Sequence, residues 1–373
     1  MMRKGLAAGA ILATLAACVP NAASNRPAAV TAPLPAPRPP AQPPTVLAAT
    51  PHAPAALNRE IGRLGAGFDG RAGIAVLDID AGWSASFNGD QPMPQQSVSK
   101  LWVAVAALDA LDRGAMRLND PVTVTRADLT LFHQPIRANV GAGGYATTIG
   151  ALLNQAMTRS DNTANDMLLW KVGGPEAVRG LLMDRGVRGV RFGPGERLLQ
   201  SRIAGLEWRQ DYAIGNGFLQ ARAALPAATR SRALDAYLDD PMDGATPLGI
   251  VDGLAKLQRG RLLSPASTRL LINTMTESRT GPQRLKAGLG AGWTAAHKTG
   301  TGQELGSLAT GYNDVAIITS PNGHSYAVAV MIASTRQSIP VRQKLMADVV
   351  RAVVAQDAVR VAANMGDDRA VMR

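Results

Sequence analysis

The chain has 373 residues, of which 46% are hydrophobic and 18% charged, a balance that supports a folded core and excludes collagen-like and wholly disordered proteins. The net charge of +11 favours an anionic neighbourhood or reflects an arginine-rich composition. Aromatic residues make up 4%, too few for the stacking surfaces of single-strand nucleic-acid binders, so we predict no nucleic-acid partner. The single cysteine excludes an internal disulfide and a cysteine-based metal cage.

The first 18 residues have the pattern of a secretory signal. Two basic residues, Arg3 and Lys4, precede an apolar run over residues 5–17, which is too short to span a bilayer as a helix. The run ends in Leu-Ala-Ala-Cys, where Cys18 is the only cysteine. This end resembles a bacterial lipobox, whose cysteine is acylated. We therefore expect a signal peptide over residues 1–17 and a lipid anchor on the periplasmic side of the cell envelope; an ordinary signal peptide is the alternative.

Residues 18–54 are predicted to form a proline-rich tether. Residues 20–54 hold 11 of the 24 prolines and no Asp, Glu or Lys, a composition typical of semi-rigid polyproline segments. At about 3.1 Å per residue, the tether reaches on the order of 100 Å. We expect residues 55–373 to form one folded domain.

That domain is predicted to carry strands at both ends and helices between them. Periodicity and turn residues predict strands over residues 74–79, 81–88, 293–297, 315–319 and 326–332, and helices over residues 55–64, 98–111, 148–158, 163–172, 176–183, 248–257, 265–275 and 341–354. Because the terminal strands have to meet in one sheet, the central helices form a separate lobe. The sequence therefore predicts a two-lobed α/β domain with a site at the seam between the lobes.

Ser97 and Lys100 form the first of three short motifs. They lie at positions i and i+3 at the head of a predicted apolar helix, so the lysine amine can reach the serine hydroxyl. A serine needs a base to become a nucleophile, and a buried lysine near other cations can lose its charge and act as that base. A solvated helix face has the same spacing, so this motif does not establish a site by itself.

Two further motifs follow along the chain. Ser160–Asn162 (Ser-Asp-Asn) stands between two predicted helices, where these residue types also serve as helix caps. Lys298–Thr301 (Lys-Thr-Gly-Thr) follows a predicted strand. A glycine allows a ligand to approach the strand closely, and the lysine and hydroxyls beside it suit a carboxylate. A strand end with a solvated lysine is the alternative.

In this order, Ser-x-x-Lys, Ser-Asp-Asn and Lys-Thr-Gly resemble the signature of class A serine β-lactamases and penicillin-binding proteins. The resemblance to class A β-lactamases covers most of residues 56–356 and extends beyond the motifs, for example to Asn313–Ala316 (Asn-Asp-Val-Ala). It implies an antiparallel sheet flanked by helices, together with an all-helical lobe. It also implies a serine hydrolase whose substrate is a small β-lactam.

The resemblance implies a role for each motif residue. Ser97 would attack the lactam carbonyl, with Lys100 as a candidate base, and Ser160 would pass a proton to the leaving nitrogen. Backbone N–H groups of Ser97 and Thr301 would form the oxyanion hole. The substrate's side-chain amide and carboxylate would be bound, respectively, by Asn162 and by Lys298, Thr299 and Thr301.

Hydrolysis of the acyl-enzyme needs a group that activates water, which in the family is a glutamate in a Glu-x-x-Leu-Asn segment. Glu196, in Glu-Arg-Leu-Leu-Gln, is the best match, with Glu207 as the second candidate and a surface glutamate as the alternative. Gln200 replaces the water-holding asparagine, and Pro194 stands where an arginine often braces the loop. Residues 201–245 are longer than the family segment, so we expect a lid, an altered pocket or a partner surface there.

Phe132 and His133, just before Pro135, fall where the family places an aromatic pocket wall, with simple packing as the alternative. The other histidines are dispersed and the carboxylates do not cluster in the sequence, so we predict no metal site and no cofactor. A tethered monomer is expected.

Three functions stay open at this point. The leading prediction is a membrane-tethered β-lactamase. A penicillin-binding-type D,D-peptidase or acyltransferase acting on peptidoglycan stems would need Ser97, Lys100 and Ser160 but not Glu196. A non-hydrolytic cell-wall-binding lipoprotein would keep its function in a Ser97→Ala variant. Whether Glu196 lies within one water's reach of the Ser97 hydroxyl separates the first two.

Overall fold

The computed structural model describes residues 52–371, and side chains up to residue 364. The predicted signal peptide, Cys18 and nearly all of the predicted tether lie outside the described residues. Within the part of the chain that is described, no helix is both long enough and apolar enough to cross a bilayer.

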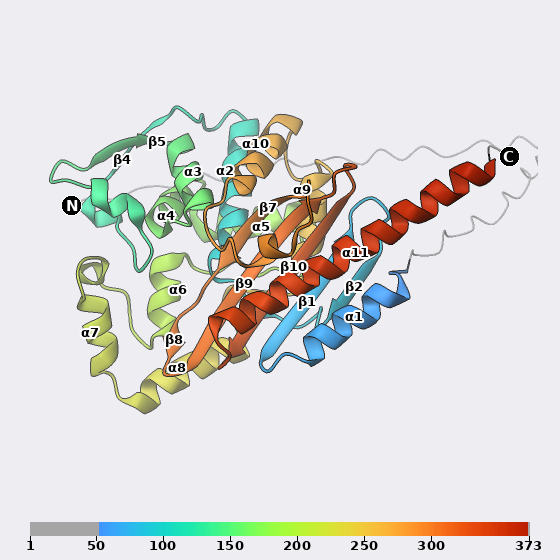
Figure 1. Cartoon of the computed structure of the whole chain (residues 1–373). Coiled ribbons are helices and arrows are strands. Elements are labelled where there is room, and N and C mark those ends of the chain that lie inside the picture. The colour runs from blue at the N-terminus through green and yellow to red at the C-terminus, as the bar shows by residue number, and fades with distance from the viewer. Residues whose placement is uncertain (1–51, 372–373) are drawn as a thin grey trace, which may run out of the picture. The chain divides into compact units, whose positions relative to one another are not determined.

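An antiparallel sheet forms the centre of the domain (Figure 1), in the order β2-β1-β10-β9-β7, with β8 paired to β9. Strands from the two ends of the domain meet in it, as predicted, because β1 pairs with β10 over its full length. The strands of this sheet are β1 (Arg71–Asp78), β2 (Ser84–Phe87), β7 (Thr294–Gly300), β8 (Glu304–Leu305), β9 (Leu308–Thr319) and β10 (Ser325–Thr335).

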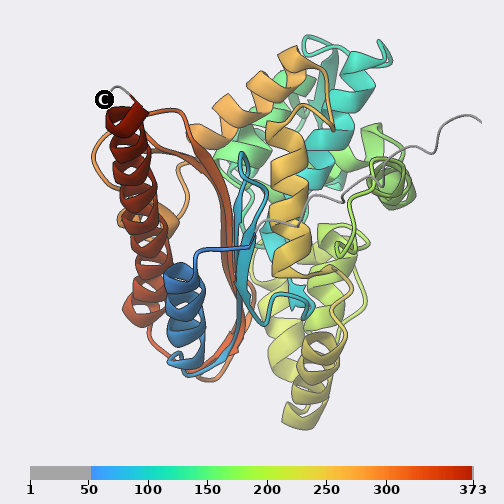
Figure 2. The ribbon, with the colours of Figure 1, turned by 90° about the vertical axis from the view of Figure 1, so that its right-hand side faces the viewer.

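Helices cover both faces of the sheet (Figure 2). Side chains alternate between the faces along each strand: in β1, Ile74 and Val76 enter the core under α1 (Ala55–Ala66) and α11 (Ile339–Val371). Ala75 enters the core on the other side, where α9 (Pro247–Gln258) contacts the sheet. The sheet therefore separates two hydrophobic cores, one of which continues into the helical lobe.

The central helix of that lobe is α2 (Lys100–Asp112), which is buried from Lys100 to Ala110. A helix with apolar residues on all sides is expected to be buried. The indole N–H of Trp102 donates to Oε1 of Gln95 at 2.7 Å, which anchors α2 to the segment that precedes it. The helices that contact α2 are α3 (Ile149–Thr158), α4 (Asn162–Lys171), α5 (Gly174–Asp184) and α10 (Pro265–Thr276).

Several short elements are not predicted by the sequence. The paired strands among them have hydrogen-bond partners far along the chain, so local periodicity does not reveal them. They include two small sheets, β3 (Met93–Pro94) with β6 (Gly244–Ala245) and β4 (Pro121–Val124) with β5 (Tyr145–Thr148), so the helical lobe also contains a pair of strands. The 3-10 helices are η1 (Gln96–Ser99), η2 (Arg126–Asp128), η3 (Pro135–Asn139), η4 (Gln210–Ala213) and η5 (Leu285–Gly288).

The segment that is long for the family folds into helices. It contains α7 (Gly217–Ala224) and α8 (Ala227–Asp239) and follows α6 (Glu196–Ile203). Two small hydrophobic cores hold it. One joins α6 to α8 and is built from Leu199, Ile203, Leu234, Tyr237 and Leu238; the other joins it to the loop before η3 through Leu131, Ala204 and Phe218.

The predicted boundaries of the helices and strands differ most from the observed ones where polar residues are buried inside a strand or where a helix is long. The strand predicted over residues 315–319 is β9, which begins at Leu308, because polar side chains inside it find buried partners. Asn313, for example, donates from Nδ2 to the carbonyl oxygens of Pro94 and Gln95. The last helix continues to Val371 rather than ending at residue 354.

Candidate active site

The predicted nucleophile lies in η1, the turn that leads into α2. Lys100, the first residue of α2, is fully buried, and its Nζ donates a 2.6 Å hydrogen bond to Oγ of Ser97. The predicted i, i+3 contact is therefore present. The serine precedes the first turn of α2, where free backbone N–H groups and the helix dipole favour negative charge.

Glu196, at the start of α6, forms a buried ion pair with Lys100. Its carboxylate and the Ser97 hydroxyl therefore contact the same ammonium group. One turn later, Gln200 donates from Nε2 to Oε2 of Glu196 at 3.2 Å, so this glutamine bonds the glutamate despite its extra methylene. Glu207, the second candidate, is exposed and does not line the pocket.

Asp166 of α4 holds the backbone that carries Glu196. Its two carboxylate oxygens accept the N–H groups of Glu196 at 3.0 Å and of Arg197 at 3.4 Å. Burial, and then the negative charge of Glu196, raise the pKa of Asp166 to about 6. The sequence analysis missed this residue, because an aspartate inside a predicted helix gave no signal of a distant partner.

The second motif links α3 to α4. Asp161 caps α4 by accepting the N–H of Ala164 at 2.9 Å, and it also accepts the N–H of Ile136 at 2.6 Å. Burial raises the pKa of Asp161. The side chain of Asn162 donates to the carbonyl oxygen of Leu131 at 2.8 Å. The capping interpretation is therefore correct for Asp161, and it leaves Ser160 facing the pocket.

Lys298 of β7 connects the third motif to the second. It is fully buried, and its Nζ donates to Oγ of Ser160 and to the carbonyl oxygen of Thr299, both at 2.9 Å. Burial, reinforced by the charge of Lys100, lowers the pKa of Lys298 well below its usual range. A lysine in this setting gains a strong interaction when an anion arrives.

Gly300 has a different role from the one predicted. A Cβ at Gly300 would overlap the carbonyl oxygen of Gln95. The glycine therefore lets β7 pack against the segment that precedes the nucleophile, rather than making room for a ligand.

Backbone strain is concentrated at this site. Among the described residues, four that are not glycine have positive φ, and three of them border the pocket or the nucleophile: Gln96 (φ 52°), Phe132 (φ 56°) and Ser160 (φ 60°). Such conformations cost on the order of 1–3 kcal/mol each and cluster at active sites, where the surrounding structure holds them.

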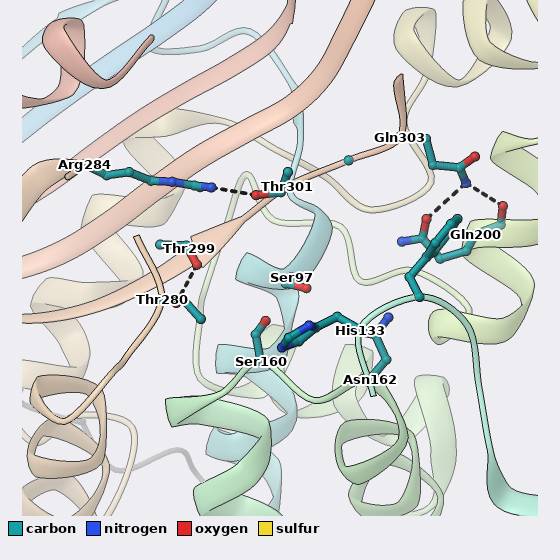
Figure 3. Close-up of a pocket in the computed structure, with 12 residues that line it drawn as sticks. Ser97, His133, Ser160, Asn162, Gln200, Thr280, Arg284, Thr299, Thr301 and Gln303 are labelled. Atoms are coloured by element: carbon teal, nitrogen blue, oxygen red, sulfur yellow. Dashed lines mark hydrogen bonds between the residues drawn. The ribbon is translucent and has the colours of Figure 1, made fainter. Parts of the chain in front are cut away.

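The three motifs surround one pocket of about 380 Å³. Figure 3 shows Ser97 between Ser160 on one side and Gln200 on the other. Lys100, Glu196 and Lys298 lie beneath the lining and are hydrogen-bonded to it. The lining residues are Ser97, Phe132, His133, Ser160, Asn162, Gln200, Thr280, Arg284, Thr299, Thr301, Gly302 and Gln303.

Arg284 is a lining residue that the sequence analysis missed. Its Nη1 donates to the carbonyl oxygens of Gly300 and Asn313, and its Nη2 donates to Oγ1 of Thr301 at 2.6 Å. The guanidinium also lies over the ring of Tyr312, 3.8 Å from its centroid. It places a permanent positive charge beside the hydroxyls of the third motif, and no motif spacing marks it in the sequence.

Phe132 and His133 both line the pocket, as the aromatic wall predicts. Phe132 is 46% exposed and packs edge-on against Phe218 of α7, with ring centroids 5.1 Å apart. His133 is hydrogen-bonded through Nε2 to the carbonyl oxygen of Arg159 at 2.8 Å. The long segment therefore supports one wall of the pocket.

One group of possible metal ligands comes together among the described residues, at the end of β1 and in the loops beside it, away from the pocket lining: Asp78, Asp80 and His324. The sequence analysis treated these residues as dispersed, but the pairing of β1 with β10 brings them together. His324 is hydrogen-bonded to Asp78 through Nε2 at 2.9 Å, and its Nδ1 lies 3.2 Å from a carboxylate oxygen of Asp80.

A serine bonded to a buried lysine, with a carboxylate on that lysine and a second serine–lysine pair across the pocket, defines a serine enzyme built for acyl transfer and hydrolysis. A family model described as the β-lactamase enzyme family matches residues 56–357, and the chain belongs to this family.

Named relatives agree with that assignment. The chain is 28% identical to the extended-spectrum β-lactamase PER-1 of Pseudomonas aeruginosa over 79% of this chain and 84% of that protein. It is 26% identical to β-lactamase VEB-1 of Pseudomonas aeruginosa over 75% and 83%. The solved structure of a class A β-lactamase representing the last common ancestor of Gram-negative bacteria is 30% identical, with a TM-score of 0.63 over 81% and 99%. The protein is a class A serine β-lactamase.

Proposed function

We propose that Ser97 carries β-lactam hydrolysis through a covalent acyl-enzyme. The observation that carries this proposal is the unbroken contact from Ser97 through Lys100 to Glu196 beneath the pocket. As Oγ of Ser97 attacks the lactam carbonyl, its proton passes to this pair. Because the two groups are in contact, a proton accepted by either one is shared by both, and the pair acts as one base.

The rest of the pocket supports the same step. The tetrahedral oxyanion is stabilised by the backbone N–H groups of Ser97 and Thr301. When the C–N bond breaks, the leaving nitrogen takes the proton of Ser160, and the Ser160 oxygen takes the proton that the Lys100–Glu196 pair accepted from Ser97, so that Glu196 is again a carboxylate. Lys298 holds the Ser160 hydroxyl in place through its hydrogen bond. The substrate's side-chain amide lies against Asn162. Its carboxylate lies among Lys298, Thr299, Thr301 and the guanidinium of Arg284.

Deacylation uses the carboxylate of Glu196 as a general base. A water between this carboxylate and the acyl carbonyl gives a proton to Glu196 and attacks the carbonyl carbon, and the ester bond to Ser97 breaks with return of a proton to Oγ. Gln200, which bonds Glu196 and lines the pocket, is placed to hold that water. This step distinguishes a β-lactamase from a penicillin-binding-type acyltransferase.

The test follows turnover of a chromogenic cephalosporin together with the intact mass of the purified protein. The parent should turn over continuously, and a Ser97→Ala variant should neither turn over nor gain the mass of the opened lactam. A single burst that ends in a stable adduct on the parent would replace hydrolysis by penicillin-binding-type acylation. Continued turnover by the Ser97→Ala variant would overturn the assignment of the nucleophile.

We also propose that the mature protein is anchored through lipidated Cys18 on the periplasmic side of the envelope and acts as a monomer. The support is the apolar run that ends in Leu-Ala-Ala-Cys and the proline-rich residues 18–54 that follow. Labelling of the parent with a radioactive fatty acid, lost in a Cys18→Ala variant, is the expected result. Equal labelling of both proteins, or none, would contradict the anchor.

A further inference from the structure

The long segment sends one polar side chain into the interior. Tyr237, near the end of α8, is 4% exposed. Its hydroxyl donates to Oδ1 of Asp243 at 2.9 Å and accepts Nε2 of Gln96 at 2.6 Å. Burial, and then the negative charge of Asp243, raise the pKa of Tyr237 well above its usual value, so the phenol keeps its proton at working pH.

Gln96 is the residue before the nucleophile, and the same two residues hold it. Its strained backbone N–H donates to Oδ2 of Asp243 at 2.6 Å, while its side-chain NH2 is held by Tyr237. Asp243 and Tyr237 thus close a buried ring with Gln96. Among the described residues, no arginine or lysine forms an ion pair with Asp243, although Asp240 nearby pairs with Arg191.

The chain of hydrogen bonds continues from Gln96 to the water-activating carboxylate. Oε1 of Gln96 accepts Nε2 of Gln200 at 3.0 Å, and the same Nε2 donates to Oε2 of Glu196 at 3.2 Å. The amide of Gln200 is fixed from its other side by Nε2 of Gln303, which donates to Oε1 of Gln200 at 3.1 Å. Every link is buried.

The donor and acceptor chemistry gives this chain a single direction. A carboxylate only accepts hydrogen bonds. The Tyr237 hydroxyl therefore donates a hydrogen bond to Asp243, and its oxygen accepts one from Gln96. Gln96 must then present NH2 to Tyr237 and its carbonyl oxygen to Gln200. As a result, Gln200 presents NH2 to Glu196 and directs its carbonyl oxygen toward Gln303.

We propose that Tyr237 is a positioning residue for deacylation: it fixes the orientation of the Gln96 amide, and through it the orientation of Gln200 against Glu196. The segment over residues 201–245 thereby takes part in hydrolysis, in addition to supporting the pocket wall. The inference rests on the proposed role of Glu196. Without the phenol oxygen, the Gln96 amide loses the partner that sets its direction, and Gln200 can turn away from Glu196.

A Tyr237→Phe variant of the full chain tests this, because it removes one oxygen and keeps the ring. We expect acylation of the chromogenic cephalosporin to stay within about twofold of the parent and deacylation to slow about tenfold, the scale of one buried hydrogen bond to a charged network. Acyl-enzyme should then accumulate in the intact-mass spectrum. Adding Gln200→Ala to this variant should slow deacylation no further than Gln200→Ala alone, because both changes cut the same chain.

Tyr326→Phe is the matched control. Tyr326 is also buried, and its hydroxyl donates to a carboxylate, Oδ1 of Asp357, at 2.9 Å. It should lower the melting temperature as Tyr237→Phe does and leave the deacylation rate unchanged. If both variants lose stability alike and neither accumulates acyl-enzyme, Tyr237 is structural and the inference is wrong. If Glu196→Gln also fails to accumulate acyl-enzyme, the failure lies with the proposed function of Glu196 instead.

Discussion

Two buried lysines lie beneath the same pocket, and each donates to the hydroxyl of one serine. Lys100 of α2 bonds Ser97 at 2.6 Å, and Lys298 of β7 bonds Ser160 at 2.9 Å. Both side chains are fully buried. Their remaining partners differ: Lys100 is paired with the carboxylate of Glu196, whereas Lys298 donates to the neutral carbonyl oxygen of Thr299.

The difference in partners separates two kinds of chemistry. A lysine in contact with a carboxylate can exchange protons without changing the net charge of the pair, which suits proton transfer at Ser97. A buried lysine bonded only to neutral oxygens carries a poorly compensated charge, which suits the binding of an anionic substrate. The lowered pKa of Lys298, which results from its burial and then from the charge of Lys100, is the electrostatic signature of that unpaired state.

The largest effect is expected at Lys100, on the proton-transfer side of the comparison. Lys100→Met removes the base next to Ser97 and leaves Glu196 buried without its partner. Acylation should fall by about 10³-fold or more, within the range of general-base contributions. The measurement is the acylation rate with a chromogenic cephalosporin. Lys256→Met, which breaks an ion pair with Asp252 on α9, is the control; an equal loss there would contradict this assignment.

A smaller effect on the rate is expected at Lys298. Lys298→Met should lower kcat/KM by about 10²-fold for substrates that carry a carboxylate, the scale of a lost charge-assisted hydrogen bond. The same change should have less effect on a lactam whose carboxylate is esterified. Lys286→Met provides the control, because Lys286 also donates to backbone carbonyls, of Thr276 and Ser278, but bonds none of the residues that line the pocket. Equal losses with both substrates would argue against anion binding by Lys298.

Arg284→Lys tests whether the guanidinium group contributes to binding of the substrate carboxylate. The substitution keeps the charge but loses the fork that reaches Gly300, Asn313 and Thr301 together. We expect KM to rise about tenfold with little change in kcat. Arg342→Lys is the control, because Arg342 also lies over Tyr312 and does not line the pocket. A fall in kcat with an unchanged KM would contradict a binding role.

The smallest effect concerns stability near Glu196. Because the pKa of Asp166 is raised to about 6 by burial and then by the charge of Glu196, the folded state holds a proton there more tightly than the unfolded state. Its stabilising contribution is present below about pH 4 and is lost as the pH rises through about 6. The free energy of unfolding of the parent should therefore fall between pH 4 and pH 7. In Asp166→Asn this fall should be smaller, by on the order of 3 kcal/mol.

Denaturant unfolding at several pH values measures this difference. Asp112→Asn should behave in the opposite way, because hydrogen bonds from Ser264 and Ser267 outweigh burial and lower the pKa of Asp112. That variant should lose stability above about pH 4, where the parent's carboxylate is charged. If Asp166→Asn leaves the pH dependence of stability unchanged, the pKa of Asp166 is not raised by burial and by the charge of Glu196 as we describe.

The sequence predicts the part of the site that depends on local spacing. Ser97 and Lys100 are one helical turn apart, and Ser160 and Lys298 stand at ends of predicted elements. Arg284 and Asp166 were missed, because each acts through backbone groups far along the chain: Arg284 on Gly300 and Asn313, and Asp166 on Glu196 and Arg197. Nothing in their local sequence marks those partners.

The distinction between local and distant partners also explains which helices and strands were predicted. The five strands and eight helices predicted from periodicity are present, because the apolar residues that bury each of them recur at a regular period within the segment itself. Elements defined by distant pairing were not predicted, such as β3 and β6, which pair Met93 with Ala245. The two helices of the long segment were missed as well, because they pack on small separate cores and their sequences carry few apolar residues in a regular period.

The most direct measurement compares Glu196→Gln with Lys298→Met by intact mass during reaction with cephalosporin at a concentration that half-saturates the parent. If Lys100 and Glu196 handle protons while Lys298 binds the substrate anion, Glu196→Gln should be almost fully acylated at Ser97, because Lys100 still serves acylation and deacylation is blocked. Lys298→Met should remain mostly free, because only acylation is slowed. Equal acylation of the two variants, or accumulation in Lys298→Met alone, would contradict this division between the two lysines.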